Sequence, residues 1–325
     1  MSRFKRNVLH GLFALLVLGA TAWSAMAIWL NLDGVARLLV LGLLALGVVA
    51  VLAARLHRRG LGWGLLVLAG LVVFGWYQTI TPRADRDWAR DVARGVTAQI
   101  AGDRITLDNI RDFDWQTPDS AHERWITRSY DLEALNSVEM LTSVWDNPDI
   151  AHLLVSFGFD SGEHIVFSVE IRREQDEQFN EIGGFFRQFE LVLIAATERD
   201  IVRLRTDVRE EDVRLYPVKL NPDQRRRMFM SYVDLAQDLD REPRFYNTVS
   251  ANCTTVVYGL ARSLKSDLPI RKSLLLSGRL PEYLDTLGVL GGEGTLEDRN
   301  ASALLPVNAQ AKHPGMTYSQ AIRAR

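Results

Sequence analysis

Cysteine is scarce in this sequence, since Cys253 is the only one in 325 residues. A lone cysteine cannot form an internal disulfide, and it excludes a zinc site built from several cysteines. The sequence also lacks the motifs HExxH, GxGxxG, GxxxxGK[ST] and GxSxG. We therefore expect no metalloprotease, dinucleotide-binding, P-loop or serine-hydrolase site, and we expect neither a metal nor a cofactor.

Long apolar runs, in contrast, fill the N-terminal part of the chain at residues 8–30, 35–54 and 61–80. Each run is long enough to cross a hydrocarbon core of about 30 Å as a helix. Because two further runs follow the first, we expect the first run to be retained and not cleaved as a signal peptide. Buried core helices are the alternative, but three such runs joined by short loops favour a membrane anchor over residues 1–83.

The charges beside these runs predict their orientation. Basic side chains cluster before the first run and between the second and the third: Arg3, Lys5 and Arg6, then Arg55, Arg58 and Arg59. The loop at 31–34 carries only Asp33. Lys and Arg concentrate on the cytoplasmic side of a membrane, so residues 84–325 should lie outside the cytoplasm. In a bacterium this predicts a multi-pass protein of the inner membrane with its C-terminal domain in the periplasm.

The outer part, residues 84–325, has the length of one domain and is acidic. Residues 1–83 hold eight basic and one acidic side chain, and the rest of the chain holds 30 basic and 39 acidic ones, a net charge of about −9. An acidic domain argues against a nucleic acid as partner. The apolar runs leave the membrane as the expected site of attachment.

Periodicity predicts strands first and helices later in the outer part. The expected elements are a helix at 85–100, a strand at 123–132, hairpins at 150–159 with 164–172 and at 189–196 with 201–206, a strand at 213–218, and helices at 221–240 and 253–265. This order is typical of an α+β domain.

Cys253 opens the last of these helices, directly after Asn252, which suits a helix N-cap. A thiol in the first helical turn lies near free backbone N–H groups and the positive end of the helix dipole, and both favour the thiolate. The same N–H groups can stabilise an oxyanion, so we assign Asn252 and Thr254 to substrate or oxyanion binding. The alternative is a small apolar side chain packed in the core.

The hairpin at 150–172 supplies a base for this thiol. A three-residue turn at 160–162, with glycine last, sets a register in which His152 lies opposite Glu170. Glu170 would orient the His152 ring while His152 takes the thiol proton. A cross-strand ion pair on a solvated face remains the alternative. The register places His164 beside the turn, where we expect a surface residue.

Several stretches together resemble the Lnb N-terminal periplasmic domain family: "AHLLVSFGF", "FSVEIRRE", "FRQFELVLIAATERDIVRLRT", "LYPV" and "YNTVSANCTT". The resemblance covers about residues 124–269 and implies a circularly permuted papain-like, NlpC/P60-like domain. It implies His152 as base and Cys253 as nucleophile, with Glu170 as their third partner. The known members of acyltransferase type have membrane segments after the domain, whereas the apolar runs here precede it.

The resemblance implies a cysteine acyltransferase that forms an acyl-thioester, with a membrane lipid and a lipoprotein as substrates. NlpC/P60-like cleavage of amides in peptidoglycan peptides is the alternative within the same chemistry. A binding module without turnover is the alternative outside it. The catalytic hypotheses require His152 and Cys253 in one cleft, and the binding module does not.

The orientation predicts the behaviour of a reporter fused after Arg325. We expect a periplasmic reporter such as alkaline phosphatase to be active at this site, because three spans starting in the cytoplasm end outside it. A cytoplasmic reporter at the same site should be silent. Activity of the cytoplasmic reporter would contradict the assigned orientation.

Overall fold

The computed structural model describes residues 3–83, 85–178, 180, 182–262, 264, 267–269 and 276–324. The chain divides into two compact units. One unit contains residues 1–84 together with 179–189, and the other contains 85–178 and 190–325. The predicted boundary at 83/84 falls beside Ala84, which lies outside the described residues.

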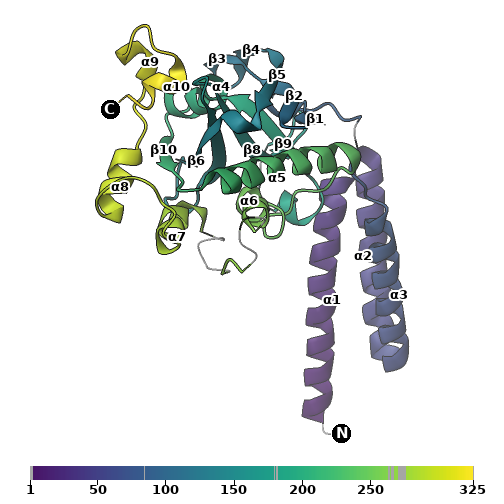
Figure 1. Cartoon of the computed structure of the whole chain (residues 1–325). Helices are drawn as coiled ribbons and strands as arrows, with labels where there is room; N and C mark the ends of the chain where they lie inside the picture. The colour runs from purple at the N-terminus through teal and green to yellow at the C-terminus, as the bar shows by residue number, and fades with distance from the viewer. Residues whose placement is uncertain are drawn as a thin grey trace. The chain divides into compact units, whose positions relative to one another are not determined.

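Three long helices make up most of the first unit (Figure 1). They are α1 (Arg3–Asn31), α2 (Gly34–His57) and α3 (Arg59–Gln78). Each is long and apolar enough to cross a membrane, which confirms the three predicted runs as helices. The buried Arg55 stacks its guanidinium over the ring of Phe13, at 4.7 Å from the centroid. Such a cation–π contact accommodates a basic side chain near the end of an apolar helix.

An eight-stranded sheet organises the second unit. Its strands are β1 (Thr97–Ala101), β2 (Arg104–Arg111), β5 (Trp125–Asp131), β6 (Leu135–Val144), β7 (His152–Phe159), β8 (His164–Arg172), β9 (Glu190–Thr197) and β10 (Asp212–Pro217). The order is β1-β2-β9-β8-β7-β6-β10, with β5 paired to β2. Among these described strands only β2 and β9 pair in parallel. A separate small hairpin joins β3 (Asp114–Thr117) to β4 (Ser120–His122).

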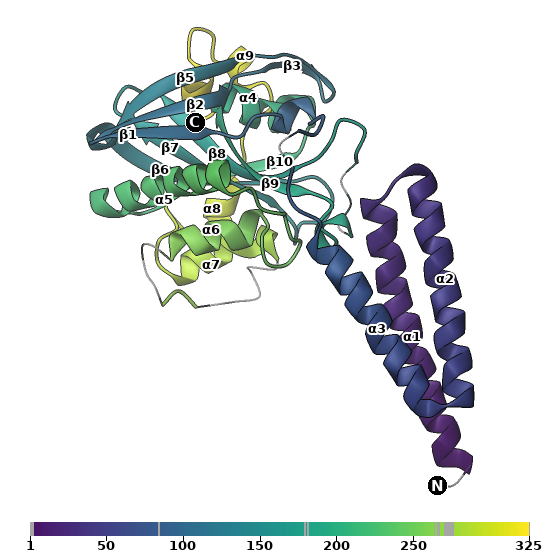
Figure 2. The same cartoon turned by 90° about the vertical axis from the view of Figure 1, so that its right-hand side faces the viewer.

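Helices cover both faces of this sheet, as Figure 2 shows for the two sides. One face packs against α5 (Pro222–Arg241), α6 (Cys253–Ala261) and α7 (Leu280–Thr286), and the other against α4 (Glu198–Arg203), α9 (Ala309–Lys312) and α10 (Tyr318–Ala321). The remaining helix is α8 (Leu296–Ala303). Aromatic rings fill the first core, where Phe167 stacks on Tyr232 at 4.9 Å and Phe157 meets Phe229 edge-on at 5.2 Å. The predicted α+β class is confirmed.

The predicted register of the β7–β8 hairpin is confirmed as well. Leu154 pairs with Ser168, and Gly158 pairs with His164. The turn uses Gly162 at φ +80°, a conformation that favours glycine. Because side chains alternate along a strand, this register puts His152, Ser168 and Glu170 on the same face of the sheet.

Of the predicted hairpin at 189–196 and 201–206, the first strand is confirmed and the second is wrong. β9 is a strand, but the chain then turns into α4 and a π-helical turn at Leu204–Val208. Thr197 caps α4 by accepting a hydrogen bond from the N–H of Asp200, with Glu198 in the first turn. This Thr-Glu-Arg-Asp sequence is a capping signal that outweighs the alternating pattern of the residues after it.

The predicted helix at 85–100 is also wrong. Its backbone hydrogen-bonds to the sheet instead, since the N–H of Ala89 donates to Arg173 O and the N–H of Val96 donates to Leu193 O, both at 2.9 Å. The segment then continues as β1. Its apolar residues match a helical period, but most of them are buried against the sheet, and tertiary hydrogen bonds replace the intrahelical bonds.

The carboxylate of Asp200 ties α4 to the C-terminal end of β2 and the residues after it, and its removal should be costly. Asp200 is fully buried and accepts hydrogen bonds from Arg111 Nε at 2.9 Å, Phe113 N at 2.8 Å and Trp115 Nε1 at 2.8 Å. Asp200→Ala should lower the free energy of unfolding by about 3–5 kcal/mol, because Arg111 is left as a buried, unpaired charge.

Chemical denaturation of the full chain in detergent micelles, followed by near-ultraviolet circular dichroism, measures this loss. The exposed Asp119 provides the control, and Asp119→Ala should change the free energy of unfolding by less than about 0.5 kcal/mol. Equal stabilities of the two variants would refute the structural role of Asp200.

Candidate active site

Cys253 is the first residue of α6, and the cap of that helix fixes its position. The Asn252 side-chain oxygen accepts hydrogen bonds from the N–H groups of Thr254 and Thr255, at 2.9 and 2.8 Å. The amide nitrogen of Asn252 donates to Thr248 O at 2.7 Å. The predicted cap is therefore confirmed, and it holds the partly buried thiol at the positive end of the helix. α6 ends at Ala261, and Lys265, the predicted end, lies outside the described residues.

His152 begins β7, and its Nε2 atom has two partners on β8. Nε2 lies 2.8 Å from Ser168 Oγ and 3.0 Å from Glu170 Oε1. Ser168 Oγ donates to Glu170 Oε1 at 2.7 Å, so it can only accept from the ring. These bonds place the proton on Nε2 and leave Nδ1 as the ring nitrogen for Cys253. The predicted meeting of His152 and Glu170 is therefore present, although the pair extends beyond the backbone ladder.

The sequence analysis did not predict two hydrogen-bond partners of Glu170. Ser168 is one, and Arg205 is the other, with Nη2 3.1 Å from Glu170 Oε1. Arg205 is almost completely buried and lies in the π-helical turn after α4, where Nη1 donates to Ile201 O at 2.9 Å. The signal for Arg205 was the cap at Thr197, because a helix starting there turns Arg205 toward the sheet.

The pKa values of His152, Glu170 and Cys253 depend on burial and on the contacts among these side chains. Burial alone would lower the pKa of His152, but the Glu170 carboxylate and hydrogen bonding with Cys253 outweigh it and raise the pKa to about 9. Burial would raise the pKa of Glu170, but His152 and Arg205 hold it far below its usual range. For Cys253, burial is outweighed by His152 and by the Leu153 N–H, so the pKa of the thiol is lowered. Both shifts favour a thiolate–imidazolium pair.

Two tyrosines lie in the field of this thiolate. Burial and the negative charge of Cys253 raise the pKa of Tyr232 and of Tyr246, so both phenols stay protonated. Tyr232 Oη is buried and has no hydrogen-bond partner in the part of the chain that the structure describes. It is therefore an unused donor in the neighbourhood of the thiol.

An apolar cavity of about 210 Å³ lies beside Cys253, between the sheet and helices α5, α6 and α7. Two residues connect it to the thiol. Thr254 lines the cavity and has Oγ1 3.9 Å from the Cys253 sulfur, and Leu153 lines the cavity while its N–H acts on the same sulfur. The wall is almost entirely aliphatic and aromatic, including Met140, Val155, Met228, Val257, Tyr258, Leu280, Leu284 and Leu287.

The residues assigned to substrate or oxyanion binding have different surroundings. The amide of Asn252 is engaged on both sides by the cap and by Thr248. Thr254 forms part of the cavity wall. The cap uses the N–H groups of Thr254 and Thr255, and the N–H of Cys253 is not one of them. Their roles in substrate binding stay predictions.

The other histidines of the outer part lie elsewhere. His164 is not the surface residue that we expected, since its Nε2 points to Glu139 Oε2 at 3.9 Å, in a cluster with Glu198. Arg323 forms ion pairs with both carboxylates of this cluster. This guanidinium therefore supplies the positive charge that the two carboxylates need. His122 lies on the exposed β4 hairpin, and His313 directly follows α9.

Comparison of the chain with curated proteins and with solved structures gives no match. The profile of the Lnb N-terminal periplasmic domain matches residues 121–287, about half of the chain. The matched region contains His152, Glu170, Arg205 and Cys253, and it extends the resemblance noted at 124–269. The chain therefore belongs to the Lnb N-terminal periplasmic domain family, and it is a membrane protein with a periplasmic domain.

Proposed function

We propose that this protein is a membrane-anchored cysteine acyltransferase, in which Cys253 accepts a fatty acyl chain as a thioester. The observation that carries the proposal is the polarised thiol beside an apolar cavity, with Thr254 and Leu153 contacting both. The acyl donor would be a phospholipid or a lipoprotein, and a lipoprotein amino terminus would be the acceptor. The permuted papain-like arrangement implied by the resemblance belongs to the same proposal.

The cavity suits an acyl chain better than a peptide. A cavity needs about 10–15 Å³ to hold one water molecule. The cavity volume of about 210 Å³ therefore holds on the order of a dozen groups of water or methylene size. Each methylene buried in an apolar wall contributes about 0.8 kcal/mol. The charged groups of a peptidoglycan peptide would lose water there without gaining partners, which costs free energy. The cavity therefore favours acyl transfer over the alternative of amide cleavage.

In the first step, the Cys253 thiolate attacks the ester carbonyl carbon of the donor, and a carbon–sulfur bond forms. The ester carbon–oxygen bond breaks, and the leaving alkoxide takes the proton that His152 carries on Nδ1. Glu170 and Ser168 keep the other ring proton on Nε2 throughout. The N–H of Cys253 at the helix start is the donor that we assign to the developing oxyanion.

In the second step, the amine of the acceptor attacks the thioester. His152, now neutral, takes a proton from the amine, and the carbon–sulfur bond breaks to release the thiolate. The acceptor leaves as an amide, and the enzyme returns to its thiolate–imidazolium form. Attack by water in place of the amine would give hydrolysis, so exclusion of water from the apolar cavity favours transfer.

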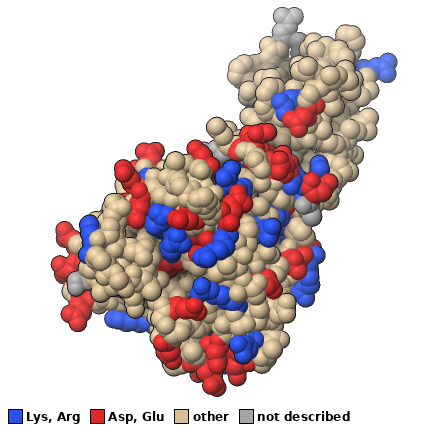
Figure 3. All heavy atoms as spheres, turned by 90° about the horizontal axis from the view of Figure 1, so that it is seen from above, with Lys and Arg blue, Asp and Glu red and all other residues tan. Residues whose placement is uncertain are grey.

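We further propose that α1, α2 and α3 all cross the inner membrane, with the N-terminus in the cytoplasm. The basic clusters around residues 3–6 and 55–59 support this orientation. The outer domain itself presents charges of both signs, and on the face seen in Figure 3 its basic and acidic side chains are interspersed. Attachment through the helices is consistent with this mixed surface.

Trapping the acyl-enzyme tests the proposal most directly. The full chain in micelles is mixed with a phospholipid of defined acyl chain, quenched in acid and weighed by mass spectrometry. We expect a mass increase of one acyl group that neutral hydroxylamine removes, because hydroxylamine cleaves thioesters rapidly. Cys253→Ala should show no increase.

A cavity variant separates the acyl chain from other substrates. Ala261 lines the cavity, so Ala261→Trp should fill it and reduce acyl loading at least tenfold, while iodoacetamide still alkylates Cys253 at the wild-type rate. Gly259 is the matched control on the same helix, since a side chain there projects into open space and Gly259→Trp should load normally. Normal loading by Ala261→Trp would show that the acyl chain lies elsewhere.

The pairing of His152 with Glu170 predicts a shift in the pH profile of acyl loading. The first step needs the imidazolium, so loading should fall as the pH rises through about 9, the raised pKa of His152. Glu170→Gln removes the carboxylate that raises this pKa, so the alkaline limb should move to lower pH. A merely structural defect would lower the rate without moving the limb.

The matched control for this profile is Glu163→Gln. Glu163 lies at the turn of the same hairpin, is exposed and pairs with Arg128. Its loss leaves the charges around His152 unchanged, so the alkaline limb should stay near pH 9. An unshifted limb in Glu170→Gln would contradict the assigned role of Glu170.

A further inference from the structure

The second part of the connection between β8 and β9, residues 179–189, belongs to the compact unit of the membrane helices, although both strands belong to the sheet. We call its described residues, Asn180 and 182–189, the interface loop. The loop follows β8 in the chain, and β8 carries Ser168 and Glu170. Its contacts with α1 and α3 show which level of the membrane unit it occupies.

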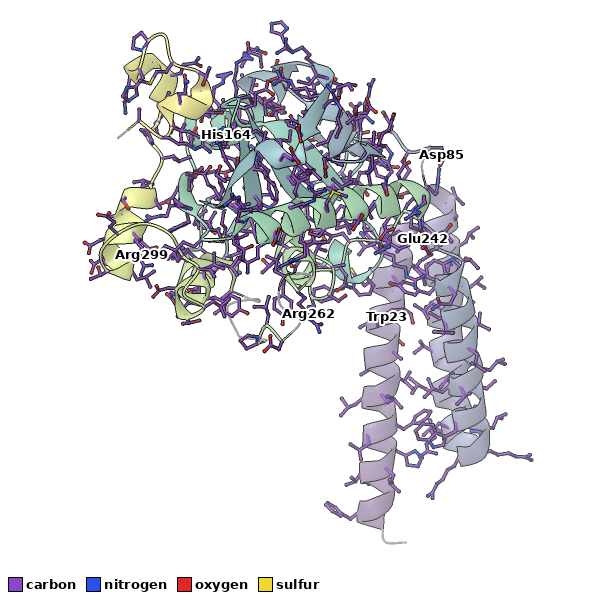
Figure 4. All side chains as sticks on the ribbon, viewed as in Figure 1. Trp23, Asp85, His164, Glu242, Arg262 and Arg299 are labelled. Carbon is purple, nitrogen blue, oxygen red and sulfur yellow. The ribbon has the colours of Figure 1, made fainter. Side chains whose placement is uncertain are left out.

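The first contact is with the outer end of α1. The side chain of Asn31 donates a hydrogen bond from Nδ2 to the carbonyl of Phe186 at 2.9 Å. The ring of Phe186 lies 5.7 Å from that of Trp23, which projects from α1 in Figure 4. Trp23 and Asn31 are about 12 Å apart along a helix that rises ~1.5 Å per residue. The loop therefore lies along the last two turns of α1.

The second contact is with the outer end of α3. Arg187 Nη1 donates to the carbonyl oxygens of Tyr77 at 2.9 Å and of Ile80 at 3.3 Å. Its guanidinium also stacks over the Tyr77 ring, at 4.6 Å from the centroid. Tyr77 lies in the last turn of α3 and Ile80 lies just beyond it, at the C-terminal end of the helix, where a cation is favoured.

The backbone conformation of the interface loop fits these contacts with α1 and α3. Arg187 has φ +58°, a left-handed conformation that is strained in a non-glycine residue and persists only where the surroundings impose it. A Cβ atom at Gly183 would lie 2.1 Å from Gln188 Oε1 and 2.7 Å from the Phe189 ring, so a side chain there would displace both. Asn180 Oδ1 accepts from the N–H of Gly183 at 2.5 Å and closes the turn.

The level of these contacts corresponds to a membrane–water interface. The outer ends of α1 and α3 carry Trp23, Trp29, Trp76 and Tyr77. Tryptophan and tyrosine concentrate at the level of the lipid headgroups. At this level the loop exposes two large apolar side chains, Ile182 at 50% and Phe185 at 48%.

We propose that the interface loop is seated in the outer interfacial layer of the bilayer, with Ile182 and Phe185 in contact with lipid. Lipid is the occupant because the loop lies against helix ends whose other faces expose large apolar side chains, as with Leu18 at 58% and Trp29 at 53%. The inference rests on the three helices crossing the membrane and not on the acyl-transfer step.

Site-directed spin labelling of the full chain in lipid vesicles tests this placement. Cys253→Ser removes the only native thiol, and Phe185→Cys then carries a nitroxide alone. We expect its collisions with oxygen to exceed those with a water-soluble nickel chelate, because oxygen concentrates in the bilayer. Val307→Cys, an exposed position of the outer domain, should show the opposite ratio.

Leu16→Cys, in the middle of α1, provides the reference for a label in the hydrocarbon core. We expect the label at position 185 to lie at a depth between those of the labels at 16 and 307. A label at 185 that is as accessible to nickel as that at 307, with 16 still buried, would overturn the loop placement while leaving the proposed function intact. An aqueous label at 16 would overturn the spanning of α1 and the inference with it.

Discussion

The hydrogen bond between His152 Nε2 and Glu170 Oε1, 3.0 Å long, is the interaction on which the rest of the site depends. A largely buried imidazole would lose its proton without a negative charge beside it, and a buried thiol would then stay protonated. Glu170 reverses the first effect, and the resulting imidazolium reverses the second. Arg205 and Ser168 in turn keep Glu170 ionised. The reactivity of one sulfur thus depends on a carboxylate that belongs to another strand.

Both layers around the sheet contribute to this arrangement. α6 brings Cys253 from one face, whereas the π-helical turn after α4 brings Arg205 from the other. His152 is the first residue of β7, where neither helical layer covers it completely. It can therefore contact residues from both layers. The apolar cavity lies on the α6 face only, so the polar network and the proposed acyl chain occupy opposite sides of the thiol. This separation lets a charged pair and an apolar substrate share one site.

Local signals predicted the features that local interactions determine. The Asn252 cap, the Gly162 turn and the alternating apolar residues of β7 and β8 were sufficient for the position of Cys253 and for its two partners. Features that depend on residues far apart in the sequence were not predicted. The segment at 85–100 was predicted as a helix because its bonds to β8 and β9 leave no trace in its own sequence. Arg205 was hidden behind an alternating pattern, and the cavity forms only where α5, α6 and α7 meet the sheet.

The central claim is that Cys253 is ionised at neutral pH because His152 is beside it. With one cysteine in the chain, the ultraviolet absorbance of the thiolate, taken as the difference between wild type and Cys253→Ser, reports this sulfur alone as the pH is raised. The account predicts a midpoint below the ordinary thiol value of about 8.5. It also predicts that His152→Ala raises this midpoint. A midpoint at or above the ordinary value in the wild type, unchanged by His152→Ala, would contradict it.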